Sequence, residues 1–141
     1  MAWNNKENEF ERDIETLVSH KNFGAIVSGM RSHAMHAGIQ EKACRAFLDL
    51  ARSDADNKVR IAQAGGIPLI LAALDTHAAD AGVVENACWA LCNIGSSDKA
   101  LQKSIKDAGA ETLVRAAVDS PDATAKTREK GQMLLDRLAQ V

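Results

Sequence analysis

Apolar residues recur at helical spacing along ENACWALCNIG, residues 85–95. They fall three or four positions apart, which places them on one side of an α-helix and predicts a buried stripe. The members of this stripe are Val84, Cys88, Leu91 and Ile94 or Gly95. A second stripe holds Trp89, Asn93 and Ser96 at positions i, i+4 and i+7. The pattern therefore predicts a helix with one face in the core and another turned away from it.

Two shorter helices are predicted before this one. NKVRIAQAG, residues 57–65, is predicted as a short helix that Gly65 stops, because glycine tolerates a left-handed or tightly turned backbone. GIPLILAALD, residues 66–75, is predicted as the next helix. Pro68 is tolerated in its first turn, since the amide that proline lacks would be unpaired there. The polar segment THAADAGVV, residues 76–84, is expected to connect this helix to the third one.

This three-helix pattern recurs along the chain. Residues 41–75 match residues 85–119 without a gap, at a shift of 44 positions. Identical pairs include Cys44/Cys88, Asp54/Asp98, Ile61/Ile105 and Gly65/Gly109. The same shift places EKGQMLLDRLA, from Glu129, on ENACWALCNIG, and SHAMHAGIQEKAC, from Ser32, on THAADAGVVENAC. A period near 44 with helices inside each unit is typical of an α-solenoid, whose units bury their apolar faces only by stacking.

The Ala-Gly turn, the leucine-rich second helix and the third helix ENACWALCNIG resemble the armadillo repeat of importin-alpha and beta-catenin, over roughly residues 17–141. The resemblance implies an all-α fold, a right-handed α-solenoid of about three stacked three-helix units. The two-helix HEAT repeat is the structural alternative, and the breaks at Gly65 and Gly109 argue against it.

We expect one armadillo-repeat domain over residues 1–141, since a chain of this length is most simply a single domain. NEFERDIETLVSH, residues 8–20, carries Phe10, Ile14, Leu17 and Val18 at helical spacing and could cap the first unit. The expected parts are a capping helix over 1–20, a partial first unit over 21–56, a full unit over 57–100 and a last unit over 101–141.

Composition excludes several classes of protein. Apolar residues make up 46% of the chain and charged residues 26%, with two prolines and no tyrosine, which is typical of a soluble helical protein. A net charge of −2 argues against a broadly basic nucleic-acid binder, and no run of like charges indicates a membrane surface. The start, MAWNNKENEF, lacks the pattern of a signal peptide. We expect a cytoplasmic protein, with a nuclear location as the alternative.

No residue constellation indicates an enzyme. Cys44, Cys88 and Cys92 lie inside helical patterns, and we interpret them as reduced core thiols, not as nucleophiles or disulfide partners. His33 and His36 could hold a metal, but no carboxylate or thiol cluster adjoins them in the sequence, so a surface loop is the favoured interpretation. We therefore expect no catalytic residues, no bound metal and no cofactor.

The armadillo resemblance implies that the third helices line a concave wall that binds extended peptides. Trp89 and Asn93 match the WxxxN pair of importin-alpha, in which Trp packs on a ligand's side-chain stem and Asn hydrogen-bonds its main chain. An amide can do so because it carries both donor and acceptor groups. The alternative is that Trp89 packs between units and Asn93 is an ordinary surface residue. The equivalent pairs, Arg45/Asp49 and Met133/Arg137, depart from the motif, so only one full pocket is expected.

Projecting this stripe onto the three copies predicts the groove residues. They are Lys42, Arg45, Asp49 and Arg52, then Asn86, Trp89, Asn93 and Ser96, then Lys130, Met133, Arg137 and Gln140. The set contains five cations and one anion. A positive groove on a protein of negative net charge favours an acidic peptide. The alternative is that these charges are solvated and paired with Glu41, Glu85 or Glu129.

The C-terminal segment suggests a second class of function. MLLDRLAQV carries Met133, Leu134, Leu135 and Leu138, more apolar surface than one helical stripe can bury, and solenoid ends need a polar cap. The alternative to a peptide-binding scaffold is therefore a structural module. Such a module would form a homo-oligomer through the C-terminal helix or belong to a longer armadillo array.

Overall fold

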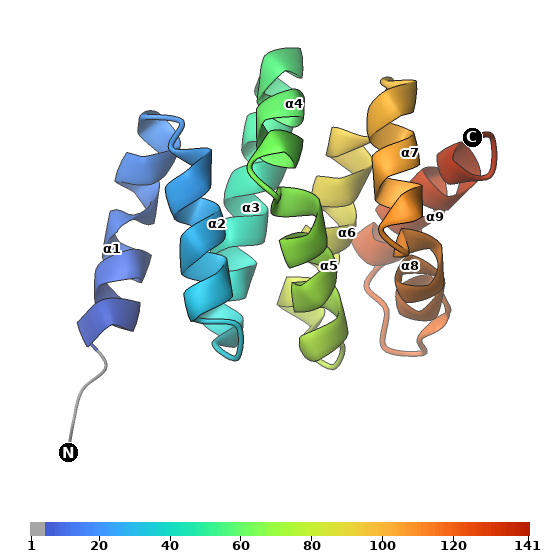
Figure 1. The fold of residues 1–141 in the computed structure, drawn as a ribbon. Helices are drawn as coiled ribbons and strands as arrows, with labels where there is room; N and C mark the ends of the chain where they lie inside the picture. The colour runs from blue at the N-terminus through green and yellow to red at the C-terminus, as the bar shows by residue number, and fades with distance from the viewer. Residues whose placement is uncertain (1–4) are drawn as a thin grey trace.

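The computed structural model describes residues 5–141 and shows an all-helical solenoid over that range (Figure 1). The first four residues of the predicted capping segment lie outside the described residues. The helices are α1 (Asn5–Ser19), α2 (Phe23–Ser32), α3 (Ala37–Ser53), α4 (Ala55–Gln63), α5 (Gly66–Thr76), α6 (Ala81–Ile94), α7 (Lys99–Asp107), α8 (Ala110–Asp119) and α9 (Ala125–Leu138).

The helices form two layers (Figure 1). In one layer, which we call the inner row, α1 packs on α3, α3 on α6 and α6 on α9. In the other layer α2, the α4–α5 pair and the α7–α8 pair cover the inner row. The predicted fold class, an all-α solenoid of stacked repeats, is confirmed.

Two glycines make the breaks between the first and second helices of a unit. Gly65 has φ of 87° and Gly109 has φ of 92°, in the left-handed region that glycine enters without a Cβ clash. The connection predicted over residues 76–84 is too long, because α5 continues to Thr76 and α6 already begins at Ala81. The cause is Asp80, whose carboxylate accepts hydrogen bonds from the amides of Gly82 and Val83 and so caps α6.

The core lies between the two layers. The predicted stripe of α6 is buried throughout, with Val84 at 7% exposure and Cys88, Leu91 and Ile94 at 0%. Cys44 and Cys88 occupy equivalent buried positions on α3 and α6, and the three thiols are free. Burial, with smaller contributions from Cys88 and Glu41, raises the pKa of the Cys44 thiol to about 12. Burial and the neighbouring Cys92 likewise raise the pKa of Cys88 to about 12.

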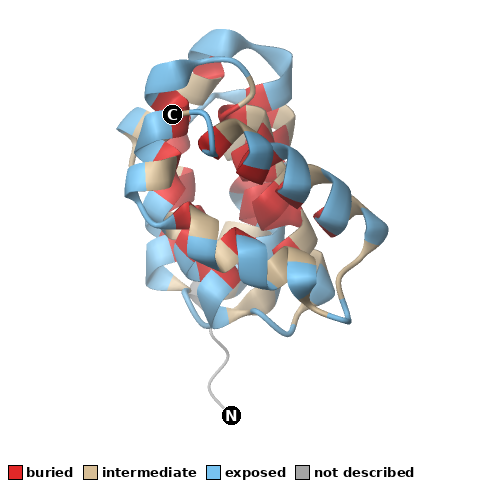
Figure 2. Cartoon of the chain, turned by 90° about the vertical axis from the view of Figure 1, so that its right-hand side faces the viewer, coloured by how far each residue is buried: buried red, intermediate tan, exposed pale blue. Residues whose placement is uncertain are grey.

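The prediction of an exposed apolar C-terminal face is wrong. Leu134, Leu135 and Leu138 are 0%, 4% and 0% exposed, and only Met133 reaches 37%. The reason is that α9 packs on three helices, α6, α7 and α8, so more than one side of it is covered. Its remaining side carries the exposed residues Arg128, Gln132 and Asp136. Viewed from this end, the exposed turns lie outside and the buried segments lie between helices (Figure 2).

Within the described part of the chain, no helix by itself has the length and apolarity needed to cross a membrane. The α4–α5 pair meets those criteria only when the two helices are taken together, and they are bent by 76° at the break between them.

We expect Gly65→Ala to destabilise the fold by about 1 kcal/mol, because alanine is strained in the left-handed region. No atom lies within 4 Å of a Cβ built at Gly65, so the backbone alone is responsible. Gly24→Ala is the matched control, since that position in α2 is equally open and has no positive φ. It should stabilise by about 0.5 kcal/mol or more. Urea unfolding measures both, and equal effects at the two positions would contradict the assignment.

The buried thiols predict a loss of stability in alkali. Above pH 9 the unfolded thiols lose their protons while the folded Cys44 and Cys88 thiols keep theirs, so the unfolded state is favoured as pH rises. The free energy of unfolding should fall by about 1.4 kcal/mol per pH unit for each thiol between about pH 9.5 and 11. A Cys44→Ala/Cys88→Ala variant, measured in parallel, should fall less steeply, and identical slopes would be the contrary result.

Candidate peptide-binding groove

A cleft of about 710 Å³ opens on the inner row between α1, α3 and α6. Because α1 and α6 each pack on α3, the α3 surface lies between the other two helices. The lining residues are Glu11, Ile14, Glu15, Val18 and Ser19 of α1, then Glu41, Lys42, Arg45, Ala46 and Asp49 of α3, then Gly82, Glu85 and Asn86 of α6. Four of the predicted groove residues, Lys42, Arg45, Asp49 and Asn86, therefore meet in one cavity.

Trp89 lies on α6 one turn beyond Glu85 and is half-buried against the core. Three cations surround its ring. The Lys126 ammonium is 4.8 Å from the ring centroid, the Lys130 ammonium 5.6 Å and the Arg45 guanidinium 5.9 Å. Cations within about 6 Å of an indole ring are attracted by its negative face. The two lysines come from α9 and Arg45 comes from α3, so the basic cluster joins three neighbouring helices of the inner row.

Several groove charges are also paired on their own helices. Asp49 lies 3.2 Å from both Arg45 and Arg52. Glu129 lies 3.3 Å from Lys130 and 3.8 Å from Lys126. The alternative that these charges form solvated pairs thus holds in part. The cations around Trp89 nevertheless outnumber the carboxylates, because Asp49 is shared with Arg52 and Glu129 is shared between both lysines.

Side-chain bonds to main-chain carbonyls join the inner helices. The Asn93 amide donates to the Leu48 carbonyl at 3.0 Å, and Asn86 donates to the Glu41 carbonyl at 3.1 Å. One unit later, Arg137 donates to the Cys92 carbonyl at 3.0 Å. Each acceptor lies 45 residues before its donor, on the preceding inner helix. Asn93 uses one amide hydrogen in this bond, and its Oδ1 has no hydrogen-bond partner among the described residues.

The remaining predicted groove residues are scattered. Ser96 accepts a hydrogen bond from Lys58 of α4, and Arg52 pairs with Asp49 beyond the cleft lining. Met133 is partly exposed on α9, and the Arg137 guanidinium donates a hydrogen bond to the Cys92 carbonyl. The structure therefore brings Lys42, Arg45, Asp49 and Asn86 together in the cleft, and it places Arg45 and Lys130 at Trp89, with Asn93 one turn farther along α6.

Sequence reasoning missed two sets of groove residues. The α1 residues of the cleft could not be projected, because α1 lies outside the 44-residue register. Lys126 was missed because it occupies the register position of Gly82, which was predicted to lie in the connection over residues 76–84 but lies in the first turn of α6.

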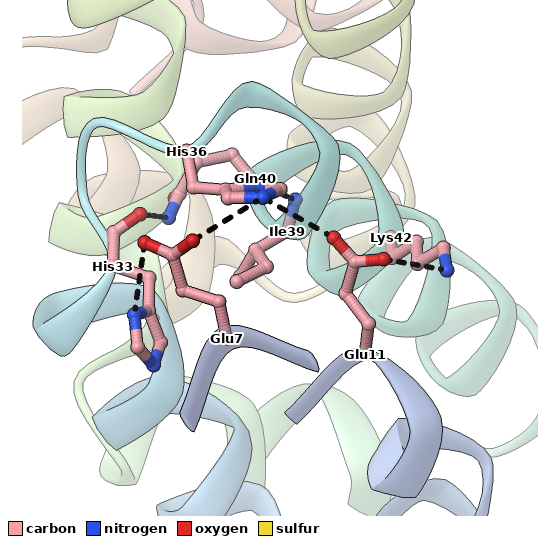
Figure 3. Close-up of polar contacts among 7 residues, drawn as sticks. All are labelled: Glu7, Glu11, His33, His36, Ile39, Gln40 and Lys42. Carbon is pink, nitrogen blue, oxygen red and sulfur yellow. Dashed lines mark hydrogen bonds and ion pairs between the residues drawn. The ribbon is translucent and has the colours of Figure 1, made fainter. Parts of the chain in front are cut away.

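The two histidines of the α2–α3 connection face the carboxylates of α1 (Figure 3). Glu7 lies 3.8 Å from His33 and 3.7 Å from His36, and Glu11 lies 3.4 Å from both His36 and Lys42. His36 Nδ1 accepts the Ile39 amide hydrogen at 3.0 Å and caps α3, so its Nε2 carries the proton that faces α1. The cluster thus fastens α1, the outer wall of the cleft, to the first unit. Within residues 5–141 no group of three or more metal-ligating side chains is arranged to hold an ion.

Comparisons with known proteins agree with this architecture. The armadillo/beta-catenin-like repeat family model matches residues 54–96, the segment of α4, α5 and α6. No curated protein sequence matches the chain.

Solved structures match nearly the whole chain. An engineered protein matches with a TM-score of 0.76 and 21% identity, over 93% of this chain and 52% of its own. A designed armadillo repeat protein matches with a TM-score of 0.75 and 20% identity, over 90% of this chain and 51% of its own. Another, solved with the peptide (KR)4, matches with a TM-score of 0.71 and 18% identity, over 92% and 56%. The chain spans about half the length of these proteins.

Asn93→Ala should destabilise the fold by about 1 kcal/mol, because the Leu48 carbonyl loses its side-chain donor. Gln132→Ala is the control, since Gln132 also makes one hydrogen bond, to Asp136, but lies exposed on α9. We expect little change in that variant. Thermal and urea unfolding measure both, and an Asn93 variant as stable as the control would show that the bond contributes nothing.

Proposed function

Since the chain has the armadillo-repeat fold, we propose that it is a non-catalytic protein-interaction module that binds an extended peptide along α3, α6 and α9. One observation carries the proposal: half-exposed Trp89 lies on the inner row, ringed by three cations that its own helix does not supply. A designed protein of similar fold binds the peptide (KR)4, which supports a peptide as ligand for this architecture.

The peptide residue that reaches Trp89 is acidic. A ligand ammonium placed on this ring would have to displace Lys126 or lie beside Lys126, Lys130 and Arg45, and like charges repel at these separations. A carboxylate would instead gain charge-assisted contacts with the same three groups. The ring and the lysine stems would pack against the apolar part of the ligand side chain. The acidic ligand proposed for this chain is opposite in charge to the basic (KR)4 peptide bound by the designed protein.

Asn93 binds the main chain of the ligand. Its amide nitrogen is held by the Leu48 carbonyl, which orients the side chain before a ligand arrives. Its Oδ1 is left to accept a hydrogen bond from a peptide N–H regardless of the peptide's sequence. Packed helices lie about 10 Å apart and an extended peptide advances about 3.3 Å per residue, so three inner helices accommodate roughly six to nine residues.

The test uses a labelled nine-residue peptide rich in glutamate with one central leucine, measured by fluorescence anisotropy against a lysine-rich counterpart. The glutamate peptide should bind more tightly, and salt should weaken its binding. Trp89→Ala should cost about 2 kcal/mol or more in binding, as aromatic anchors do.

Lys126→Gln/Lys130→Gln should also weaken binding of the glutamate peptide. Its matched control is Lys103→Gln/Arg115→Gln, which removes the same charge from exposed positions on α7 and α8, outside the inner row. Equal losses in the two double variants would show non-specific attraction. Preference for the lysine-rich peptide would contradict the acidic assignment. If Trp89→Ala unfolds the protein while the folded fraction keeps its affinity, Trp89 is a packing residue only.

A further inference from the structure

The cleft between α1, α3 and α6 differs in charge from the surface around Trp89. It is lined by five carboxylates and two cations. Glu11 pairs with Lys42, and Asp49 pairs with Arg45, so these four charges neutralise one another. Glu15, Glu41 and Glu85 remain, and within the described residues none of the three is in an ion pair.

These three carboxylates converge from three different helices. Glu15 comes from α1, Glu41 from α3 and Glu85 from α6, so they are not neighbours along one solvated helix face. The Glu41 carboxylate lies against Gly82 of α6, where the absence of a side chain leaves room for it, because a Cβ at position 82 would overlap the carboxylate. Glu85 accepts a hydrogen bond from the Thr124 hydroxyl at 2.7 Å, which holds its side chain without neutralising it. Two of these carboxylates, Glu41 and Glu85, therefore lie against a neighbouring segment, whereas Glu15 is exposed on α1.

The cleft also offers apolar surface. Ile14 and Val18 of α1 and Ala46 of α3 line it and pack against the core. A lysine or arginine side chain matches this combination, since its aliphatic stem can cover apolar atoms while its charged head meets carboxylates. A volume of about 710 Å³ accommodates such a side chain together with the main chain that carries it.

The cleft adjoins the Trp89 cluster directly. Arg45 both lines the cleft and lies over the Trp89 ring, and Glu85 precedes Trp89 by one turn of α6. Helices about 10 Å apart correspond to about three residues of extended peptide. The inner row thus presents an acidic half toward α1 and a basic half toward α9.

We propose that the peptide bound here has a fixed charge order: a basic residue in the cleft between α1 and α6, about three residues from the acidic residue at Trp89. The proposal rests on the proposed function and specifies its ligand. Charge complementarity selects this occupant, because a uniformly acidic peptide would place carboxylates against Glu15, Glu41 and Glu85, and a uniformly basic one would meet the lysines around Trp89.

The experiment compares three labelled peptides of equal length by fluorescence anisotropy at fixed ionic strength. The first has a central acidic block flanked by Gly and Ser. The second and third replace the residue three positions before or after the acidic block with lysine. One of the two lysine peptides should bind about tenfold more tightly than the first, because the cleft lies on only one side of Trp89.

The gain should disappear in a Glu15→Gln/Glu41→Gln/Glu85→Gln variant, which should bind the first peptide at least as well as the wild type does. Asp75→Asn/Asp119→Asn/Asp122→Asn is the control, with the same charge change at exposed positions outside the cleft, and it should keep the gain. Glu15→Gln alone, at an exposed position of α1, should lose part of the gain and guards against misfolding of the triple variant.

One set of results would overturn the inference and leave the proposed function intact. The acidic peptide would bind through Trp89, but neither lysine peptide would bind more tightly, or the gain would survive in the triple cleft variant. Failure of all three peptides to bind would overturn the proposed function and the charge order together.

Discussion

The structure depends on the packing of α3 against α6 and of α6 against α9. No single helix of the inner row can bury its own apolar stripe, so each requires a neighbour. Ala43 and Ala87, small side chains at equivalent positions, are fully buried in this packing, and small side chains allow packed helices to approach closely. At this separation Asn86 and Asn93 reach the carbonyls of α3, and Arg45 and Lys126 reach the ring of Trp89 from opposite neighbours. The core packing and the groove chemistry therefore have the same origin.

The repeat explains why the fold could be predicted so fully. A register of 44 residues, read with Gly65 and Gly109 as breaks, predicted the helix order and the buried stripe of α6. The two errors have a common cause. The start of α6 and the burial of Leu134 and Leu135 are decided by local contacts, an Asp80 cap in one case and the covering helices α7 and α8 in the other. Hydrophobic periodicity records which face is apolar but does not record how many neighbours cover it.

The candidate groove was predictable only where it follows the repeat. Projection along the register found Arg45 and Trp89, which the structure brings together. It could not find Glu11 and Glu15, since α1 packs on α3 in place of an inner helix but comes from outside the register. Nor could it show that the Asn93 amide is already bonded to α3, because such a bond depends on how far one helix is shifted along the next.

The register position shared by Gly82 and Lys126 has a consequence for how such arrays diversify. On α6 the missing side chain leaves room for the Glu41 carboxylate, and on α9 a lysine at the same position reaches across to Trp89. One surface position per unit, in the first turn of the inner helix, is thus associated with opposite local charge on the two helices, while the core beneath it is unaffected. A single substitution at this position can therefore change the charge that the inner row presents without changing a residue of the core.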